Sequence, residues 1–136
     1  MSNTEPRPSN ALRDSWALQS AASSVGFDWP DIAGVFDKVR EEIEEIRDAW
    51  SRGDREQAKR ELGDVLFASV NLARFLDADP SEELHRANER FRARFDLLKK
   101  IVRAQGRELE ECTLSELDEV WEHVKRLRGE RSKKRS

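Results

Sequence analysis

Residues 65–76 read VLFASVNLARFL, and this stretch decides the fold class. Wound as a helix, it is apolar on almost every side, and a helix without a clear polar face is buried on most sides. No part of the chain shows the sustained alternation of apolar and polar residues that is typical of a β-strand. The stretch therefore predicts an all-α protein that buries this helix.

Helical periodicity and helix-end signals extend the prediction in both directions. Gly53 and Asp54 break the pattern before this helix, so we expect the helices on either side of them to form a hairpin. Residues 79–82, and later Thr113 with Glu116, have the spacing of helix starts. The predicted helices cover about residues 10–24, 31–51, 55–76, 80–105 and 113 onward. They predict an all-α bundle of four to five helices.

The length of 136 residues suits one domain. We predict a helical domain over residues 10–128, between a disordered N-terminus at residues 1–9 and a basic, disordered tail at residues 129–136. The apolar stretch at residues 65–76 exceeds what the neighbouring helices of a small bundle can cover. The sequence therefore also predicts a homodimer.

Composition excludes several classes of protein. A membrane span needs about 20 consecutive, mostly apolar residues, and the sequence has none. Residues 1–10 lack the apolar segment of a secretory signal. The single cysteine, Cys112, excludes an internal disulfide and a cysteine-based zinc site. We expect a cytoplasmic protein, and the net charge of −3 argues against a nucleic-acid partner.

Acidic residues form rows beside the apolar stripes of two successive helices, and the stripe of the first helix, which we expect to face the core, is Val39, Ile43, Ile46 and Trp50. Glu42 and Glu45 share one row at the margin of the core, and Glu61 and Asp64 share a row on the next helix, where the apolar run begins. Four such carboxylates would repel one another, by about 4 kcal/mol for two charges 4 Å apart. Mg²⁺, or Mn²⁺ in its place, would relieve this repulsion through oxygen ligands. The alternative is that both acidic faces are simply solvated.

The acidic rows carry a resemblance to a known family. Residues 41–45 (EEIEE) and 61–64 (ELGD) resemble the EExxE and ExxD pair of the MazG-type all-α nucleoside triphosphate pyrophosphohydrolases. The resemblance covers about residues 12–125 and matches the C-terminal, catalytic half of the two-domain members, so the chain resembles a free-standing catalytic unit. Further similar segments are residues 25–31, 37–39, 63–68, 70–74, 87–91 and 119–121.

The resemblance implies an activity and a set of site residues. The implied reaction is Mg²⁺-dependent hydrolysis of a nucleoside triphosphate to the monophosphate and pyrophosphate, which clears the nucleotide pool. The implied metal ligands, which are also catalytic residues, are Glu42, Glu45, Glu61 and Asp64. Glu41 would orient or deprotonate water, and Lys38 would meet a phosphate. The implied nucleotide contacts are Asn88, Arg90 and Trp121, with Arg90 at a position where the family commonly has lysine.

Two other kinds of protein remain alternatives. A non-catalytic helical dimerisation module would leave the acidic rows as solvated surface, and a regulatory module would bind nucleotides without turnover. Two local features are also open. Phe27 and Trp29 either line a base pocket or pack against a helix end, and packing is favoured. Asn71, within the apolar stretch, needs hydrogen-bond partners in either a structural or a catalytic role.

Overall fold

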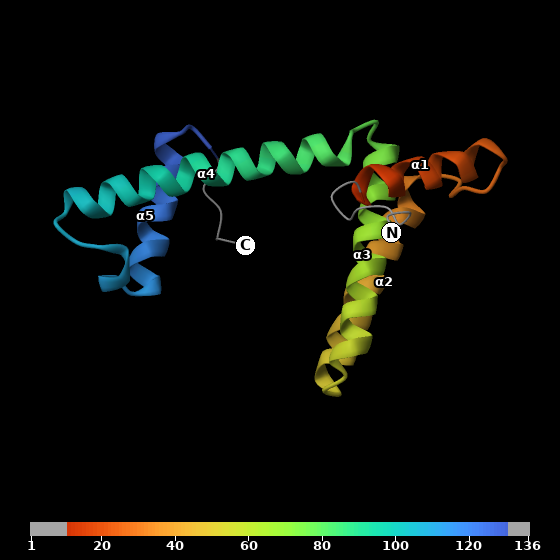
Figure 1. The fold of residues 1–136 in the computed structure, drawn as a ribbon, viewed down its shortest axis with the longest axis horizontal. Helices are drawn as coiled ribbons and strands as arrows, with labels where there is room; N and C mark the ends of the chain where they lie inside the picture. The colour runs from red at the N-terminus through yellow and green to blue at the C-terminus, as the bar shows by residue number, and fades with distance from the viewer. Residues whose placement is uncertain (1–10, 131–136) are drawn as a thin grey trace, which may run out of the picture. The chain divides into compact units, whose positions relative to one another are not determined.

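A computed structural model describes residues 11–130 of the chain, and these residues form helices and no strands (Figure 1). The all-α class is confirmed, and the helix bounds nearly coincide with the predicted ones. The predicted disorder at residues 1–9 lies outside the described residues, as does most of the predicted tail. The elements are α1 (Ala11–Ser24), α2 (Ile32–Ser51), α3 (Arg55–Phe75), α4 (Pro80–Ala104), the short 3₁₀ helix η2 (Leu109–Glu111) and α5 (Leu114–Leu127).

The chain divides into two compact units, and the border between Glu83 and Leu84 falls inside α4. The first unit holds α1, α2, α3 and the start of α4. The second holds the rest of α4, η2 and α5. The boundaries of a single domain over residues 10–128 stay a prediction. Within the part of the chain that the structure describes, no helix is both long and apolar enough to cross a lipid bilayer.

The first unit is built on the predicted hairpin of α2 and α3, which lie side by side (Figure 1). Side-chain oxygens cap both helices at their N-termini, because the first N–H groups of a helix have no partner within it. Asp31 accepts a hydrogen bond from the backbone N–H of Ala33, and Asp54 accepts one from that of Gln57. Gly53 between the helices has φ of 73°, a conformation that glycine adopts at little cost. Helix α1 packs on α3.

The seam of the hairpin contains carboxylates. The buried residues of α2 are Val35, Glu42 and Ala49, seven residues apart, and α3 buries Glu61 and Ala68 with the same spacing. A repeat of seven is the pattern by which two helices keep one face in contact. The prediction that Glu42 lies at the margin of the core is therefore wrong, since its side chain lies inside the seam.

The larger apolar residues of the hairpin are less buried than the sequence predicts. The row of α2 that was expected to face the core includes Ile43 and Trp50, which are 44% and 61% exposed. On α3, Leu66 and Phe67 are 51% and 49% exposed. The prediction that α3 is buried on most sides is wrong for the single chain, because only α2 and α1 pack substantially against it.

The second unit has a small core of its own between α4 and α5. The buried members of this core are Leu98, Val102, Trp121 and Val124. Thr113 and Glu116 form the predicted capping box at the start of α5. The buried residues of α4, Leu98 and Val102, lie in its second half, whereas Leu84 and Phe91 in its first half are 52% and 56% exposed.

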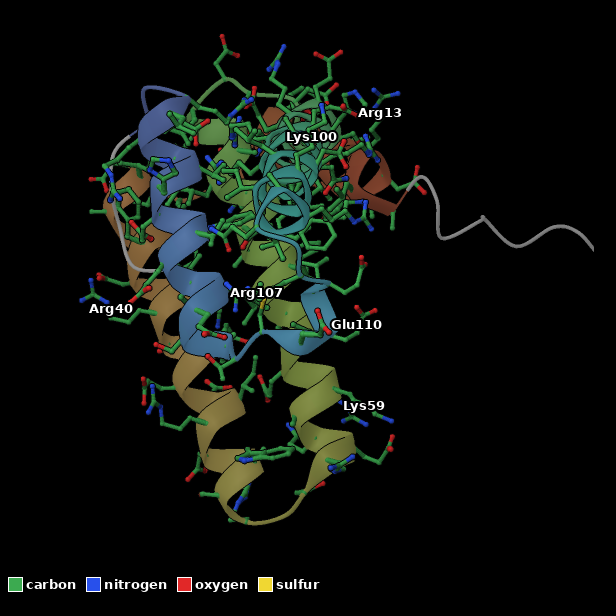
Figure 2. All side chains as sticks on the ribbon, turned by 90° about the vertical axis from the view of Figure 1, so that its left-hand side faces the viewer. Arg13, Arg40, Lys59, Lys100, Arg107 and Glu110 are labelled. Carbon is green, nitrogen blue, oxygen red and sulfur yellow. The ribbon has the colours of Figure 1, made fainter. Side chains whose placement is uncertain are left out.

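Charged side chains cover the outside of the helices. Figure 2 shows Arg40 of α2 and Lys59 of α3 extending away from the hairpin, whereas Arg107 of the second unit is half-buried and lies 3.3 Å from Glu116 Oε1 through its Nη1. Of the predicted basic tail, Glu130 lies within the described residues, and its carboxylate accepts a hydrogen bond of 2.6 Å from Arg94 Nε. Most of the charge among the described residues is thus surface charge, and the buried exceptions are Glu42 and Glu61 in the hairpin seam and Lys125 on α5.

Candidate metal centre

Two overlapping groups of carboxylates lie on the hairpin. Glu41, Glu42 and Glu45 of α2 form one group, and Glu42 forms the second with Glu61 and Asp64 of α3. In each group, one oxygen from every residue lies within 4.8 Å of the others. The structure thus brings Glu42, Glu61 and Asp64 together across the hairpin, and it groups Glu41 and Glu45 with Glu42, the member common to both groups. The α2 and α3 carboxylates approach each other because Glu42 and Glu61 occupy the seam.

Glu61 is the least satisfied of these residues. Its side chain is buried, and Oε1 accepts a hydrogen bond of 2.6 Å from Nε2 of Gln57, one turn earlier on α3. The other oxygen, Oε2, is buried and has no hydrogen-bond partner among the described residues. An unpaired buried carboxylate oxygen is costly unless a cation or a donor reaches it. An all-oxygen donor set with such an atom fits a hard divalent cation.

Lys38 supplies the positive charge next to Glu42. Its Nζ lies 3.1 Å from Glu42 Oε1 and 3.3 Å from Glu41 Oε1. The hydrogen bond to Glu42, followed by that to Glu41, raises the pKa of Lys38 above its ordinary value. Lys38 is therefore a firmly protonated group beside the carboxylates, as a residue that meets a phosphate should be.

Two of the carboxylates, Glu42 and Asp64, line a cavity of about 280 Å³. Asp64 is exposed, although it stands where the apolar run of α3 begins. Exposure and a position on the cavity wall make Asp64 accessible to a ligand. The residues that line the cavity are Gln19, Trp29, Val35, Lys38, Glu42, Asp64, Phe67, Ala68 and Asn71.

A second cavity, of about 500 Å³, shares part of this wall. Trp29 lines both cavities and also packs on α2, where a Cβ atom added to Gly34 would lie only 2.7 Å from Trp29 Cε3. The packing interpretation of Trp29 and its place in a pocket are thus compatible. The residues that line the second cavity are Leu18, Gln19, Ala22, Phe27, Asp28, Trp29, Phe67, Asn71 and Arg74.

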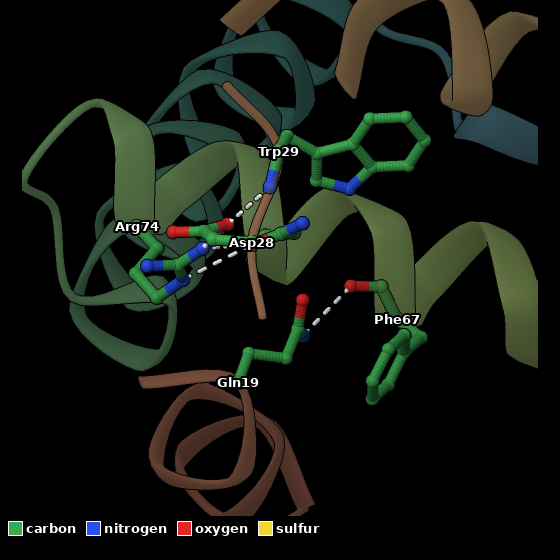
Figure 3. Close-up of polar contacts among 6 residues, drawn as sticks. Gln19, Asp28, Trp29, Phe67 and Arg74 are labelled. Carbon is green, nitrogen blue, oxygen red and sulfur yellow. Dashed lines mark hydrogen bonds and ion pairs between the residues drawn. The ribbon is translucent and has the colours of Figure 1, made fainter. Parts of the chain in front are cut away.

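An ion pair ties the loop before α2 to α3. Arg74 Nη2 lies 2.6 Å from Asp28 Oδ1, and the two side chains are 14% and 22% exposed (Figure 3). The hydrogen bond from Arg74, followed by one from Ser23, lowers the pKa of Asp28 below its ordinary value of 3.8. Asp28 also accepts a hydrogen bond from the backbone N–H of Trp29. The ion pair therefore anchors the segment that carries Trp29.

The remaining predicted site residues belong to the second unit. Asn88 and Arg90 are exposed on α4. Trp121 is 8% exposed, and its ring centroid lies 5.4 Å from that of Phe91. Its place in the core agrees with the structural interpretation of an aromatic residue at helical spacing. The role of all three as nucleotide contacts stays a prediction.

Several site residues carried no decisive signal in the sequence. Gln57 lies four residues before Glu61, and this spacing, which puts two side chains next to each other on a helix, could have indicated their hydrogen bond. Gln19, Asp28 and Arg74 meet only through the fold, since the Gln19 and Arg74 contacts join residues 48 and 46 positions apart. No local pattern indicates such contacts.

Comparison with known proteins finds a family model that matches the middle of the chain. Residues 31–95 match the model of the MazG nucleotide pyrophosphohydrolase domain. The chain carries a MazG domain. It is 41% identical over 115 residues to the nucleoside triphosphate pyrophosphohydrolase/pyrophosphatase MazG of Thermotoga maritima, which covers 85% of this chain and 44% of that protein. It is 42% identical over 123 residues to the nucleoside triphosphate pyrophosphohydrolase of Escherichia coli K12, covering 89% of this chain and 47% of that protein.

The resemblance to the MazG type is therefore confirmed. The chain spans somewhat under half the length of these two relatives. All five carboxylates of the candidate metal centre, together with Lys38, lie within the matched residues 31–95.

Proposed function

We propose that this protein hydrolyses nucleoside triphosphates to nucleoside monophosphate and pyrophosphate with Mg²⁺, or Mn²⁺ in its place, and so clears the nucleotide pool. The observation that carries the proposal is the buried, unpartnered Oε2 of Glu61 within a group of carboxylates that reaches a cavity. The MazG domain and the names of the two relatives support the same reaction.

The carboxylates have separable roles in this proposal. Glu42, Glu45, Glu61 and Asp64 would hold the cation, and Gln57 orients Glu61 through its hydrogen bond. A bound Mg²⁺ would supply charge neutralisation for the polyphosphate and lower the pKa of water. The side chain of Glu41 is 61% exposed and belongs to the same group, so it is placed to take a proton from water.

The proposed reaction is a displacement at the α-phosphorus. The water oxygen attacks the α-phosphorus, the bond from this phosphorus to the bridging oxygen breaks, and pyrophosphate leaves. Lys38 meets the charge of the phosphates at the cavity wall. Asn88, Arg90 and Trp121 are the further nucleotide contacts of this proposal, as the resemblance to the MazG type implies. Arg90 keeps the charge of a lysine and adds a planar fork of donors, so its phosphate contact differs in geometry.

We also propose that the protein is a homodimer in the cytoplasm, where nucleoside triphosphates are made and used. The support for the dimer is the exposed apolar surface of the hairpin. Phe36, Ile43 and Trp50 follow one face of α2 at intervals of seven residues, and Leu62 and Leu66 follow one face of α3. All five are at least 44% exposed. Apolar rows of this kind mark protein interfaces more often than free surface.

The test of the proposed activity is pyrophosphate release from standard, deoxy and damaged nucleoside triphosphates, with and without Mg²⁺. Release that depends on the metal is the expected result. Binding without product would favour a regulatory module, and neither binding nor product would favour a dimerisation module. Either outcome would overturn the proposed hydrolysis.

A further inference from the structure

The two cavities of the first unit adjoin, because Gln19, Trp29, Phe67 and Asn71 line both of them. The smaller cavity ends at the carboxylates and Lys38, where the proposed function puts the phosphates. A nucleotide held there by its phosphates has its base within reach of the larger cavity. That cavity, of about 500 Å³, has aromatic walls and few polar groups, which is the usual character of a small-molecule pocket.

The polar groups of the larger cavity have fixed orientations. Arginine has only donors, so the atom of Asn71 that faces Arg74 is the acceptor Oδ1, at 3.0 Å from Nε and 2.8 Å from Nη2. A backbone carbonyl only accepts, so the atom of Gln19 that faces the Phe67 carbonyl at 3.1 Å is the donor Nε2. Figure 3 shows this amide nitrogen at the Phe67 carbonyl, with the amide oxygen pointing away from it.

Each amide therefore keeps one group for a ligand. Asn71 Nδ2 and Gln19 Oε1 make no hydrogen bond with any of residues 11–130, and neither is sealed from solvent. Both residues are 8% exposed and line both cavities, so the joined cavities are the place where a partner can reach them. Besides the paired side chains of Asp28 and Arg74, the pocket thus presents a donor group on Asn71 and an acceptor on Gln19.

Arg74 holds this arrangement. Its guanidinium is shared between Asp28 of the loop and Asn71 of α3. A flip of the Asn71 amide would turn its NH₂ group towards the guanidinium and lose both hydrogen bonds. The Asp28–Arg74 pair is largely shielded from solvent and gives the amide one favourable orientation.

We propose that Asn71 and Gln19 recognise the edge of the nucleobase, Asn71 as donor and Gln19 as acceptor, with Arg74 as a positioning residue. The inference rests on the proposed function, since the phosphates place the base. It assigns base selectivity to the first unit and to residues outside the carboxylate groups.

Asn71→Asp is the sharpest test. The aspartate keeps an oxygen for Arg74 and replaces the donor that faces the cavity by an acceptor. Guanine offers two adjacent N–H donors on one edge, whereas the other three bases pair a donor with an acceptor. The ratio of kcat/KM for GTP to that for ATP, CTP or UTP should rise about 10-fold or more. An equal change for all four substrates would overturn the proposal.

Two variants complete the design. Arg74→Gln frees the Asn71 amide to rotate, so the differences among the four substrates should shrink, and unchanged differences count against the proposal. Arg13→Gln breaks an ion pair with Asp79 elsewhere in the same unit, 3.6 Å long, and should leave the ranking of substrates as it is.

A measurement on the unmodified chain separates this inference from the proposed hydrolysis. The side-chain amide resonances of Asn71 and Gln19 should shift in ¹⁵N spectra when AMP, CMP, GMP or UMP is added without metal, to different extents for different bases. Unshifted resonances at saturating nucleotide would overturn the inference. This test does not depend on whether the Asn71→Asp variant folds. Absent pyrophosphate release together with base-dependent shifts would reject the hydrolysis alone.

Discussion

Glu42 of α2 and Glu61 of α3 lie in the seam of one helical hairpin, 4% and 8% exposed, with carboxylate oxygens within 4.8 Å of each other. Seams between helices are normally apolar, because two buried charges of one sign repel and lose hydration. Lys38 compensates Glu42, and Gln57 satisfies half of Glu61. The two buried carboxylates therefore lower the stability of the hairpin, and a cation bound between them would raise it again.

Mg²⁺ should stabilise the fold through this seam. A ligand that binds only the folded state at 100 times its Kd adds about 2.7 kcal/mol to the free energy of unfolding. Urea unfolding with and without Mg²⁺ measures this gain. Glu61→Gln should abolish the gain yet leave the metal-free protein at least as stable, because it removes a buried charge and keeps an acceptor for Gln57. Glu44→Gln, at an exposed ion pair with Arg47, is the control and should keep the gain. An undiminished gain in Glu61→Gln would refute the metal assignment.

Substitution of Glu42 should abolish metal binding, whereas substitution of Glu41 should affect proton transfer alone. Glu42→Gln and Asp64→Asn should lose both metal binding, measured by calorimetry, and pyrophosphate release, while circular dichroism shows the helices intact. Glu41→Gln should keep metal binding and lower kcat about 100-fold or more, because only proton transfer is affected. Normal pyrophosphate release by Glu42→Gln or Asp64→Asn contradicts the metal site, and normal kcat of Glu41→Gln contradicts the proton-transfer role.

Helix bounds were predictable because their signals are local. Gly53 and Asp54 end one helix and start the next, and the Thr113–Glu116 box has the predicted hydrogen bonds. The hairpin and the carboxylates on it followed from the same periodicity. What failed was the choice of the buried face of α2. The sequence favours its largest apolar residues, whereas the helices meet along Val35, Glu42 and Ala49.

The pocket of the first unit was not predictable for another reason. Hydrogen bonds from Gln19 to Phe67 and from Arg74 to Asp28 depend on how α1 and the loop before α2 pack against α3. One sequence without that packing gives no reason to prefer these residues over other polar ones. Asn71 was recognisable as a residue that needed partners, and the structure identifies Arg74 as the one that fixes it.

Two helical glycines should respond oppositely to alanine. A Cβ atom on Gly34, in the first turn of α2, would lie 2.7 Å from Trp29 Cε3 and force the indole to move. Gly34→Ala should therefore cost about 1–3 kcal/mol of unfolding free energy, the usual cost of overpacking. Gly63, within α3, has no atom within 4 Å of the added Cβ, and Gly63→Ala should gain up to about 1 kcal/mol. Urea unfolding measures the change in unfolding free energy of each variant. A Gly34→Ala protein more stable than the wild type would contradict the packing of Trp29 against Gly34.

Acid should weaken the anchor of the loop before α2. Because the hydrogen bond from Arg74 lowers the pKa of Asp28 below 3.8, the ionised carboxylate contributes stability at neutral pH. That contribution is lost as the pH falls through the folded-state pKa, below the ordinary value. The difference in unfolding free energy between wild type and Asp28→Asn should be constant from about pH 5 to 8 and narrow below about pH 4. If the difference in unfolding free energy between the two proteins stays constant below about pH 4, the Asp28–Arg74 ion pair is not the source of the stability.

The exposed apolar rows of the hairpin predict a dimer that a single charge can break. Leu66 is 51% exposed on α3, and a glutamate there would have to be desolvated in an apolar interface. Sedimentation at micromolar concentration should give a dimer for the wild type and a monomer for Leu66→Glu.

The control is Arg47→Glu, which changes a side chain on α2 that is 76% exposed and should keep the dimer. Glu45→Lys is not used as a control, because Glu45 belongs to the carboxylate group. If the wild type sediments as a monomer, the apolar rows do not bind a second copy of the chain, and the proposed dimer is refuted. A monomer of Arg47→Glu together with a dimer of Leu66→Glu would place the interface on another face. The three chains together therefore test both the existence of the dimer and the helix face that forms it.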